Sequence, residues 1–344
     1  MRKLIVNGAL SLLVGVAMLW FTLDRMLADI PTDGRPVGQV ILQSIADLPW
    51  WALPAYGASF LVVHVARILR WVEQVRPLGE TDRRLVFRVC AIGYAAIVLF
   101  PWRLGEVVRP YLLARESKNV SFAAAAGTTV TERIIDGLLI TLLFFVCTAT
   151  APQAASDVVR SSGLISLAVF SSATVGIVLF AWQRPLALWL LRNTFGRVHA
   201  GVAAALERLM QGFLEGLSSL KASGALGSFV ILTVIYWSAN AGGIWLLATA
   251  FGIELPFMAG FGLLSVLVIG IMLPAGPGFL GNFQFFLGEG LRLYVPALTV
   301  ASFGFSLSMN LLQLLLQVGF AVPFLLMSGL GLRGLIEVQR QAST

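Results

Sequence analysis

Long apolar segments separated by short polar connections cover almost the whole chain. Six of them reach the roughly 20 residues that a helix needs to cross the hydrocarbon core of a bilayer. They cover residues 4–23, 50–69, 121–150, 163–182, 225–251 and 297–327. The first follows two basic residues as a signal peptide would, but it lacks a convincing small-residue cleavage site, so we expect a retained span. This pattern predicts a polytopic helical membrane protein.

Two further apolar segments are short or interrupted. As a helix, residues 89–100 would extend only about 18 Å, less than the roughly 30 Å core, and PWRLGEVVRP (101–110) follows them. Residues 256–273 and 283–294 flank a second break, LPAGPGFLGN (273–282). Because non-helical backbone at membrane depth must be buried in protein or face a wet cavity, we predict two re-entrant hairpins.

The two halves of the chain, residues 50–183 and 225–327, each contain a span, a broken hairpin and another span. Interrupted segments at corresponding positions of two halves are typical of inverted-repeat transporters, with the site between the halves. Residues 184–224 have apolar positions at helical spacing, which predicts an amphipathic cytoplasmic linker. We therefore predict an all-α polytopic membrane protein with about six full spans and two re-entrant broken hairpins arranged as an inverted repeat. It would form a single domain over residues 1–330, followed by a short cytoplasmic tail (331–344).

Basic residues are unevenly distributed between the polar connections. Residues 24–49 contain four aspartates and two arginines. Residues 67–88, in contrast, contain six arginines: Arg67, Arg70, Arg76, Arg83, Arg84 and Arg88. Because cytoplasmic connections are enriched in Lys and Arg, this second segment is predicted to be cytoplasmic and the first to lie outside. Both chain termini are then expected to be cytoplasmic.

The composition supports the same class of protein. Of the 344 residues, 58% are hydrophobic and 12% are charged, about half of the roughly 25% charged residues in soluble domains. This excludes a soluble enzyme, a secreted disulfide scaffold and a disordered chain. Two cysteines (Cys90, Cys147) and two histidines (His64, His199) are too few for a four-thiolate or histidine-based metal site. We expect no metal or cofactor, and we attribute the formal net charge of +7 to membrane topology rather than to nucleic-acid binding.

Six ionisable residues form two clusters within or beside the predicted membrane segments. They are Arg103, Glu106, Arg109, Glu132, Arg133 and Asp136. The first three recur every three residues and sum to +1, while the last three sum to −1, which suits mutual pairing across two helices. Each charge at the bilayer centre costs about 2.5–3.5 kcal/mol on insertion scales, so the six must be paired or hydrated. Two interpretations stay open: a role in binding or gating, and a purely architectural network.

The second break, PAGPGFLGNFQ (274–284), combines flexible backbone with neutral polar groups. Its candidate ligand-facing residues are Pro277, Gly278, Gly281, Asn282 and Gln284. Glycines permit close approach of the backbone, and successive amides form anion-binding concavities. A helix that starts near Gly281 would point its positive end at the same place. The alternative is a turn that only reverses the chain.

One polar stripe runs along the last predicted span. It contains Ser306, Asn310, Gln313 and Gln317, spaced by four, three and four residues. This spacing is compatible both with hydrogen bonding between helices and with the lining of a polar path.

Three stretches carry a family resemblance: PWRLGEVVRPYLL (101–113), Ser121 with TERIIDGL (131–138), and LPAGPGFLGNFQ (273–284). In order and spacing they resemble the flippase-like transmembrane part of lysylphosphatidylglycerol synthases, the multiple peptide resistance factors, over about residues 1–330. The residues that match the family pattern are Arg103, Glu106, Arg109, Glu132, Arg133, Asp136, Pro277, Gly278 and Gly281. Relatives often have an acid where this chain has Gln284, and Gly-Gly where it has Gly278-Phe279.

The resemblance implies a bacterial inner-membrane protein that moves a lipid between leaflets or serves a lipid pathway. Full-length synthases add a soluble aminoacyl-transferase domain, for which 344 residues leave no room, so lysyl transfer is not expected. The sequence also contains no Gly-x-Ser-x-Gly, His-Glu-x-x-His or Walker motif, and we do not expect an enzyme.

Our leading hypothesis is a lipid flippase in which Arg103, Arg109 and Arg133 receive a phosphate, while the carboxylates balance or gate it. The alternative is an accessory or enzymatic subunit of envelope-lipid synthesis that binds a lipid without moving it. The expected partner is a membrane lipid, either a phospholipid, a glycolipid or an isoprenoid-linked lipid. A second copy of the chain or a biosynthetic enzyme is a further candidate partner, and nucleic acid is not expected.

Overall fold

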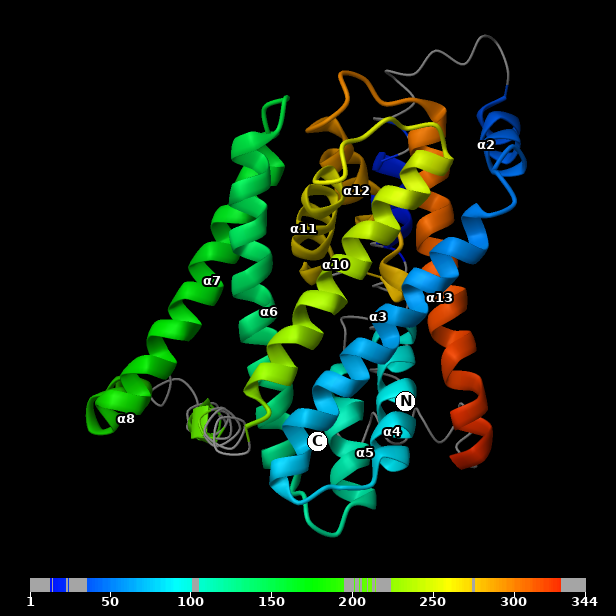
Figure 1. The fold of residues 1–344 in the computed structure, drawn as a ribbon. Coiled ribbons are helices and arrows are strands. Elements are labelled where there is room, and N and C mark those ends of the chain that lie inside the picture. Colours follow the sequence, from blue (N-terminus) through cyan, green and yellow to red (C-terminus); the bar gives the residue numbers. More distant parts are fainter. Residues whose placement is uncertain are drawn as a thin grey trace.

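The computed structural model describes residues 36–100, 105–194, 224–273 and 276–328, together with residues 13, 15–22, 24, 201, 204, 206–208, 210, 211 and 214. Helices and their connections make up this part of the chain, and no strand occurs in it (Figure 1). Its helices that are long and apolar enough to cross a membrane are α3 (Ala52–Val75), α6 (Phe122–Thr150), α7 (Asp157–Trp182), α10 (Leu226–Ala250) and α13 (Val300–Ser328). They match five of the six predicted spans in place, length and apolar character, as a polytopic α-helical membrane protein requires. The sixth predicted span, residues 4–23, falls largely outside the described residues.

Side-chain caps fix where several of these helices begin. Ser121 accepts a hydrogen bond from the Ala124 backbone N–H at 3.2 Å and starts α6. Ser156 accepts one from the Val159 N–H at 3.4 Å and starts α7. These serine side chains accept hydrogen bonds from backbone N–H groups of the first turn, which have no partner within the helix. The residues next to each boundary therefore determine where the helix starts.

Two helical hairpins occupy the predicted breaks. In hairpin one, α4 (Arg83–Leu99) packs against α5 (Val108–Glu116). In hairpin two, α11 (Ala259–Met272) packs against α12 (Asn282–Arg292), with a single 3₁₀ turn (Pro277–Phe279) between them. The hairpins lie toward opposite ends of the helical bundle (Figure 1).

The predicted ends of three helices need correction. Helix α7 begins at Asp157, before the start of the span predicted over 163–182. The apolar segment predicted over 50–69 continues as α3 to Val75, so Arg67 and Arg70 lie within that helix and not in a cytoplasmic connection. The segment predicted over 89–100 begins as α4 at Arg83, where the Asp82 side chain caps it. Hydropathy ends a segment at the first charges, whereas the backbone stays helical wherever those charges find a partner or water.

The contacts between helices are reciprocal between the two halves. Helices α3 and α10 pack along each other and run in opposite directions (Figure 1). Helix α4 of hairpin one contacts α13, and α11 of hairpin two contacts α6. In the same way α5 contacts α6, and α12 contacts α13. Each hairpin therefore packs against at least one long helix of its own half and at least one of the other half.

Glycines set the distance between α6 and α7. A Cβ on Gly137 of α6 would lie 2.0 Å from the ring of Phe170, and a Cβ on Gly163 of α7 would lie 2.1 Å from the ring of Phe144. Both rings are buried. Because each ring fills the space above a glycine of the other helix, the two helices approach as small-residue interfaces do in membranes.

Two shorter helices lie at the edges of the bundle. Helix α2 (Val37–Ala46) contacts α13, and α8 (Arg184–Thr194) follows α7 and crosses its end (Figure 1). Helix α8 covers the start of the predicted amphipathic linker; most of residues 195–223 lie outside the described part of the chain.

Candidate functional site

A cavity of about 160 Å³ lies where the two hairpins meet α3, α6, α10 and α13. Tyr94 and Arg109 of hairpin one and Ile271 and Gly278 of hairpin two are among its lining residues. The wall combines apolar side chains of α11 with charged side chains of α3, α5 and α6.

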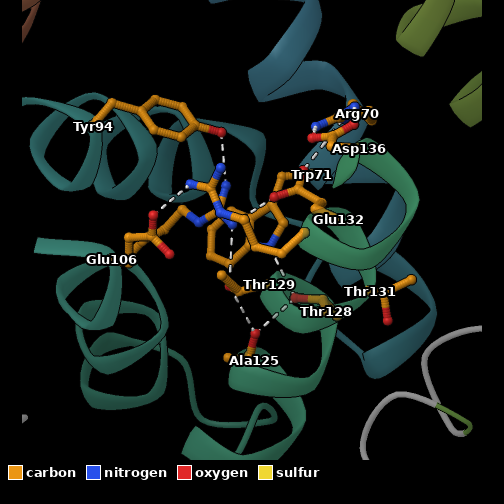
Figure 2. A network of polar contacts seen from close by, with 12 residues as sticks. Arg70, Trp71, Tyr94, Glu106, Ala125, Thr128, Thr129, Thr131, Glu132 and Asp136 are labelled. Carbon is orange, nitrogen blue, oxygen red and sulfur yellow. Dashed lines mark hydrogen bonds and ion pairs between the residues drawn. The ribbon is translucent and has the colours of Figure 1, made fainter. Parts of the chain in front are cut away.

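The first ion pair at the cavity joins Arg109 of α5 to Glu132 of α6. The Arg109 guanidinium donates to Glu132 Oε2 at 2.5 Å, to the Thr129 hydroxyl at 3.1 Å and to the Tyr94 hydroxyl at 2.7 Å (Figure 2). It also lies 4.5 Å from the ring centroid of Trp71. These partners are side chains of α3, α4 and α6, so three helices hold this arginine in one geometry.

The second ion pair joins Arg70 of α3 to Asp136 of α6. Two nitrogens of Arg70 donate to the two carboxylate oxygens of Asp136, each at 2.7 Å (Figure 2). The Trp237 indole N–H of α10 donates to the same carboxylate at 3.2 Å. Arg70 Nε lies 3.5 Å from Glu132 Oε1, so Glu132 stands between two arginines. Buried charges are tolerated in this form, paired and further hydrogen-bonded.

Two glycines allow the parts of hairpin one to pack closely enough to place Arg109 and Glu106 in their ion pairs. A Cβ on Gly93 of α4 would lie 2.7 Å from Cβ of Arg109, and one on Gly105 would lie 2.1 Å from the backbone carbonyl carbon of Ala96. Close packing therefore explains why a glycine, Gly105, stands in the Arg-Leu-Gly-Glu stretch. It lets the chain run directly against α4, which places the next residue, Glu106, beside α6.

A third ion pair, between Glu106 and Arg133 of α6, is more accessible than the other two. Arg133 donates to Glu106 Oε1 at 3.1 Å, and the side chains are 37% (Arg133) and 26% (Glu106) exposed. In the first two pairs each side chain is at most 10% exposed. The six-residue network predicted from the sequence thus divides into a locked part and an accessible part. Arg103, the remaining predicted member, lies outside the described residues.

The polar residues of hairpin two hydrogen-bond to one another. The Gly281 N–H donates to Gln284 Oε1 at 2.8 Å, and the Gln284 amide donates to Asn310 Oδ1 at 3.1 Å. Asn310 in turn donates to the Gly278 carbonyl at 2.8 Å. This chain of bonds fixes the turn against α13, which fits the interpretation of the break as a structural turn.

Gly281 also permits a close contact with the N-terminal segment. Its φ is 83°, and a Cβ there would lie 2.5 Å from the Gly15 carbonyl oxygen and 2.6 Å from Cβ of Met18. This side of the turn is therefore covered by protein, and Gly278, at φ 67°, is the glycine of the turn that lines the cavity.

The predicted site residues divide into two sets. Those that line the cavity are Arg109, Glu132, Arg133, Asp136, Gly278, Asn310 and Gln313. Those that the structure describes outside its lining are Glu106, Pro277, Gly281, Asn282 and Gln284.

The polar stripe of α13 serves both functions considered for it. Asn310 and Gln317 make hydrogen bonds to hairpin backbone, to the Gly278 and Tyr94 carbonyls respectively. Asn310, Gln313 and Gln317 also line the cavity, while Ser306 donates within its own helix to the Phe303 carbonyl.

Sequence reasoning missed the contribution of α3. His64, Arg67 and Arg70 all line the cavity, although the two arginines were expected to mark the cytoplasmic side. The spacing could have revealed them, because residues three apart on a helix share a face and these three recur at that interval. The same interval was recognised for Arg103, Glu106 and Arg109.

Arg67 has a different environment from the other arginines of the cavity. It donates to His64 Nε2 at 2.6 Å, and its guanidinium carbon lies 3.6 Å from the ring centroid of Tyr94. His64 Nδ1 lies 3.2 Å from the Phe60 carbonyl oxygen, which places the histidine proton on Nδ1 and leaves Nε2 as the acceptor. None of the described carboxylates pairs with Arg67.

Comparison with known proteins identifies one family. A family model described as the lysylphosphatidylglycerol synthase TM region matches residues 8–320. Searches of the curated proteins and of the solved structures returned no match to the chain. The matched range contains both hairpins and every residue of the cavity.

Proposed function

The chain belongs to the family of lysylphosphatidylglycerol synthase transmembrane regions, and from this we propose that it translocates an anionic or phosphate-bearing lipid across a bacterial inner membrane. The observation that carries the proposal is the charge-lined cavity to which both hairpins contribute. The matched region is the flippase-like part of such synthases and not their aminoacyl-transferase domain. The proposal therefore gives the cavity a transport role and no catalytic step.

We propose that the two halves form an inverted repeat with the site between them. The reciprocal packing of hairpins and long helices supports this, as does the placement of the hairpins at opposite ends of the bundle (Figure 1). The polar pairs also correspond: Arg109 meets Glu132 in one half, as Gln284 meets Asn310 in the other. Glu132 and Asn310 each lie ten residues after the first residue of their long helix. Paired broken segments of this kind place a transporter site near the midplane of the bilayer.

Charge distribution supports an orientation with the α3–α4, α5–α6 and α7–α8 connections in the cytoplasm. These connections and the adjoining helix ends contain Arg76, Arg83, Arg84, Arg115, Lys118 and Arg184, and they lie at one end of the bundle (Figure 1). By the positive-inside rule this end faces the cytoplasm, so hairpin one would enter from inside and hairpin two from outside. Both termini would then be cytoplasmic.

In the proposed mechanism the lipid head group enters the polar cavity while its acyl chains stay in the hydrocarbon region. The two locked ion pairs, Arg70–Asp136 and Arg109–Glu132, hold the helices around the cavity. The accessible pair, Glu106–Arg133, joins hairpin one to α6 and can exchange its partners with water or a head group. Movement of the hairpins relative to the long helices would expose the cavity to each leaflet in turn.

Reconstituted liposomes test this proposal. Fluorescently labelled phosphatidylglycerol in both leaflets is bleached by an impermeant reductant, and a flippase makes the inner-leaflet fraction accessible. The variant Gln313→Trp introduces a large side chain from the cavity wall and is expected to stop the movement. The variant Leu315→Trp places the same side chain on the outer face of the same helix, where Leu315 is 68% exposed, and should leave movement intact.

The same experiment evaluates the alternative, a subunit of envelope-lipid synthesis that binds a lipid without moving it. Folded wild-type protein that fails to accelerate lipid exchange, yet binds the labelled lipid in detergent, would replace transport by this second function. Equal exchange in the wild type and Gln313→Trp would show that lipids cross somewhere other than the cavity.

A further inference from the structure

We propose that Arg67 is the anion receptor of the cavity and that the preferred head group is a phosphodiester with a single negative charge, so that a lysylated, net cationic lipid is disfavoured. This inference rests on the proposed function and specifies its substrate class. It reassigns phosphate recognition from the arginines expected in the sequence to one that the sequence analysis had placed in a connection.

The charges of the described cavity do not balance. Four arginines line it: Arg67, Arg70, Arg109 and Arg133. Asp136, Glu132 and Glu106 neutralise the last three, one carboxylate for each. The fourth, Arg67, has no carboxylate partner among the described residues. Among the described residues the cavity therefore carries one uncompensated positive charge, which an anion of charge −1 would balance.

A neutral partner holds Arg67 in place. The acceptor of its hydrogen bond is a neutral imidazole, because His64 donates its Nδ1 proton to the Phe60 carbonyl. A neutral acceptor positions the guanidinium without cancelling its charge, whereas a carboxylate would do both. The ring of Tyr94 supports the guanidinium plane at 3.6 Å, and the same tyrosine accepts a hydrogen bond from Arg109 through its hydroxyl.

One hydrogen-bond donor of Arg67 is still available to a ligand. Arg67 Nε is buried and has no hydrogen-bond partner among the described residues. A buried donor on a charged group is costly when it stays unsatisfied, and a planar guanidinium matches the oxygens of a phosphate. Two neutral amides on the cavity wall, Asn240 and Gln313, can hydrogen-bond the remaining polar atoms of a head group without adding charge.

These features discriminate between lipids by charge. Phosphatidylglycerol carries one phosphodiester charge and therefore balances Arg67. Its lysylated form adds two ammonium groups, which would bring a net positive charge beside an unpaired guanidinium. Like charges in a region of low dielectric constant repel strongly, so the cationic lipid should bind less well.

Two measurements on the purified protein test the inference. The first is competition between short-chain phosphatidylglycerol and short-chain lysylphosphatidylglycerol for binding in detergent, with glycerophosphoglycerol as the head group without acyl chains. We expect the anionic lipid to bind about tenfold or more tightly than the cationic one, as for a hydrogen-bonded charge pair. Binding of glycerophosphoglycerol as tight as that of the lipid would identify a site for a soluble phosphodiester instead.

The second measurement uses Arg67 variants in binding and in the liposome assay. Arg67→Gln should reduce phosphatidylglycerol binding about tenfold and abolish the preference over the cationic lipid, while Arg67→Lys keeps the charge and should keep the preference. Arg88→Gln is the matched control, because Arg88 pairs with Glu116 away from the cavity and its loss should change neither. Thermal unfolding of each variant separates loss of the site from loss of the fold.

The outcomes distinguish this inference from the proposed function. If wild-type protein moves lipids but prefers the lysylated form, or if folded Arg67→Gln keeps the wild-type preference, the assignment of Arg67 is overturned and transport stands. If no lipid moves while phosphatidylglycerol binding still requires Arg67, transport is overturned and the receptor stands. A lower melting temperature in Arg67→Gln with unchanged lipid preference would assign the arginine to architecture.

Discussion

Neutralising Asp136 tests whether the Arg70–Asp136 pair holds the helices around the cavity. In the Asp136→Asn variant the side chain keeps its size but loses its charge. Arg70, whose side chain is 4% exposed, then keeps only Glu132 as a charged partner, at 3.5 Å, in place of two bonds of 2.7 Å. Removing one partner of a buried pair costs about 3–5 kcal/mol, because an uncompensated charge is left behind. This is a large share of the roughly 5–15 kcal/mol that stabilise a folded protein.

The cysteines of the chain provide the assay. Cys90 and Cys147 are free and buried, so a thiol-reactive dye reports thermal unfolding in detergent without further labelling. We expect a clearly lower melting temperature for Asp136→Asn than for wild type. Glu116→Gln is the control, because it removes a carboxylate from a pair whose side chains are about 30% exposed, and such pairs contribute only about 0–1 kcal/mol.

A double-mutant cycle makes the reasoning refutable. Adding Arg70→Gln to Asp136→Asn removes the stranded charge, so the double variant should be more stable than the sum of the two single effects predicts. Additive losses would mean that the two residues act independently. A melting temperature of Asp136→Asn equal to that of the control would show that the pair is not structural.

Three other expectations follow from packing and pairing. Gly137→Ala places a Cβ against the facing phenylalanine ring of α7 and should lower the free energy of unfolding by about 1–3 kcal/mol, measured by thermal unfolding. Gly242→Ala is the control, because a Cβ there meets open space and should leave stability unchanged. Equal effects of the two substitutions would contradict the packing argument. Glu106→Gln breaks the accessible pair with Arg133, so we expect a stability change within about 1 kcal/mol but slower lipid exchange in liposomes. A much lower melting temperature with unchanged exchange by the folded variant would instead assign the pair to stability. Gln284→Glu removes the amide donor of the hairpin-two hydrogen-bond chain, so it should lower the melting temperature by the equivalent of about 1–3 kcal/mol; unchanged stability would show that the chain of bonds is dispensable.

The sequence alone determined the number and the approximate position of the long helices in the described part of the chain. A membrane span is specified by the length and polarity of one continuous segment, and that information is local. The prediction over 121–150 agrees with α6 to within one residue at its start. The agreement is close because the apolar run and the serine cap both mark the same boundary. The two breaks at proline and glycine were equally local signals, and both became connections between helices that pack together.

Only the tertiary structure decided which charges meet. The sequence indicated that its two charged clusters pair, and Arg109–Glu132 and Arg133–Glu106 do so. The main partner of Asp136, however, is Arg70, which lies 66 residues away on a helix whose charged end resembles a cytoplasmic connection. A hydropathy scale marks an arginine as the end of a span because it evaluates each side chain as if lipid surrounded it. Inside a bundle the surroundings are other helices, and a carboxylate, an imidazole or an aromatic ring at the right distance offsets the cost of the charge, so its place depends on packing between helices far apart in the chain.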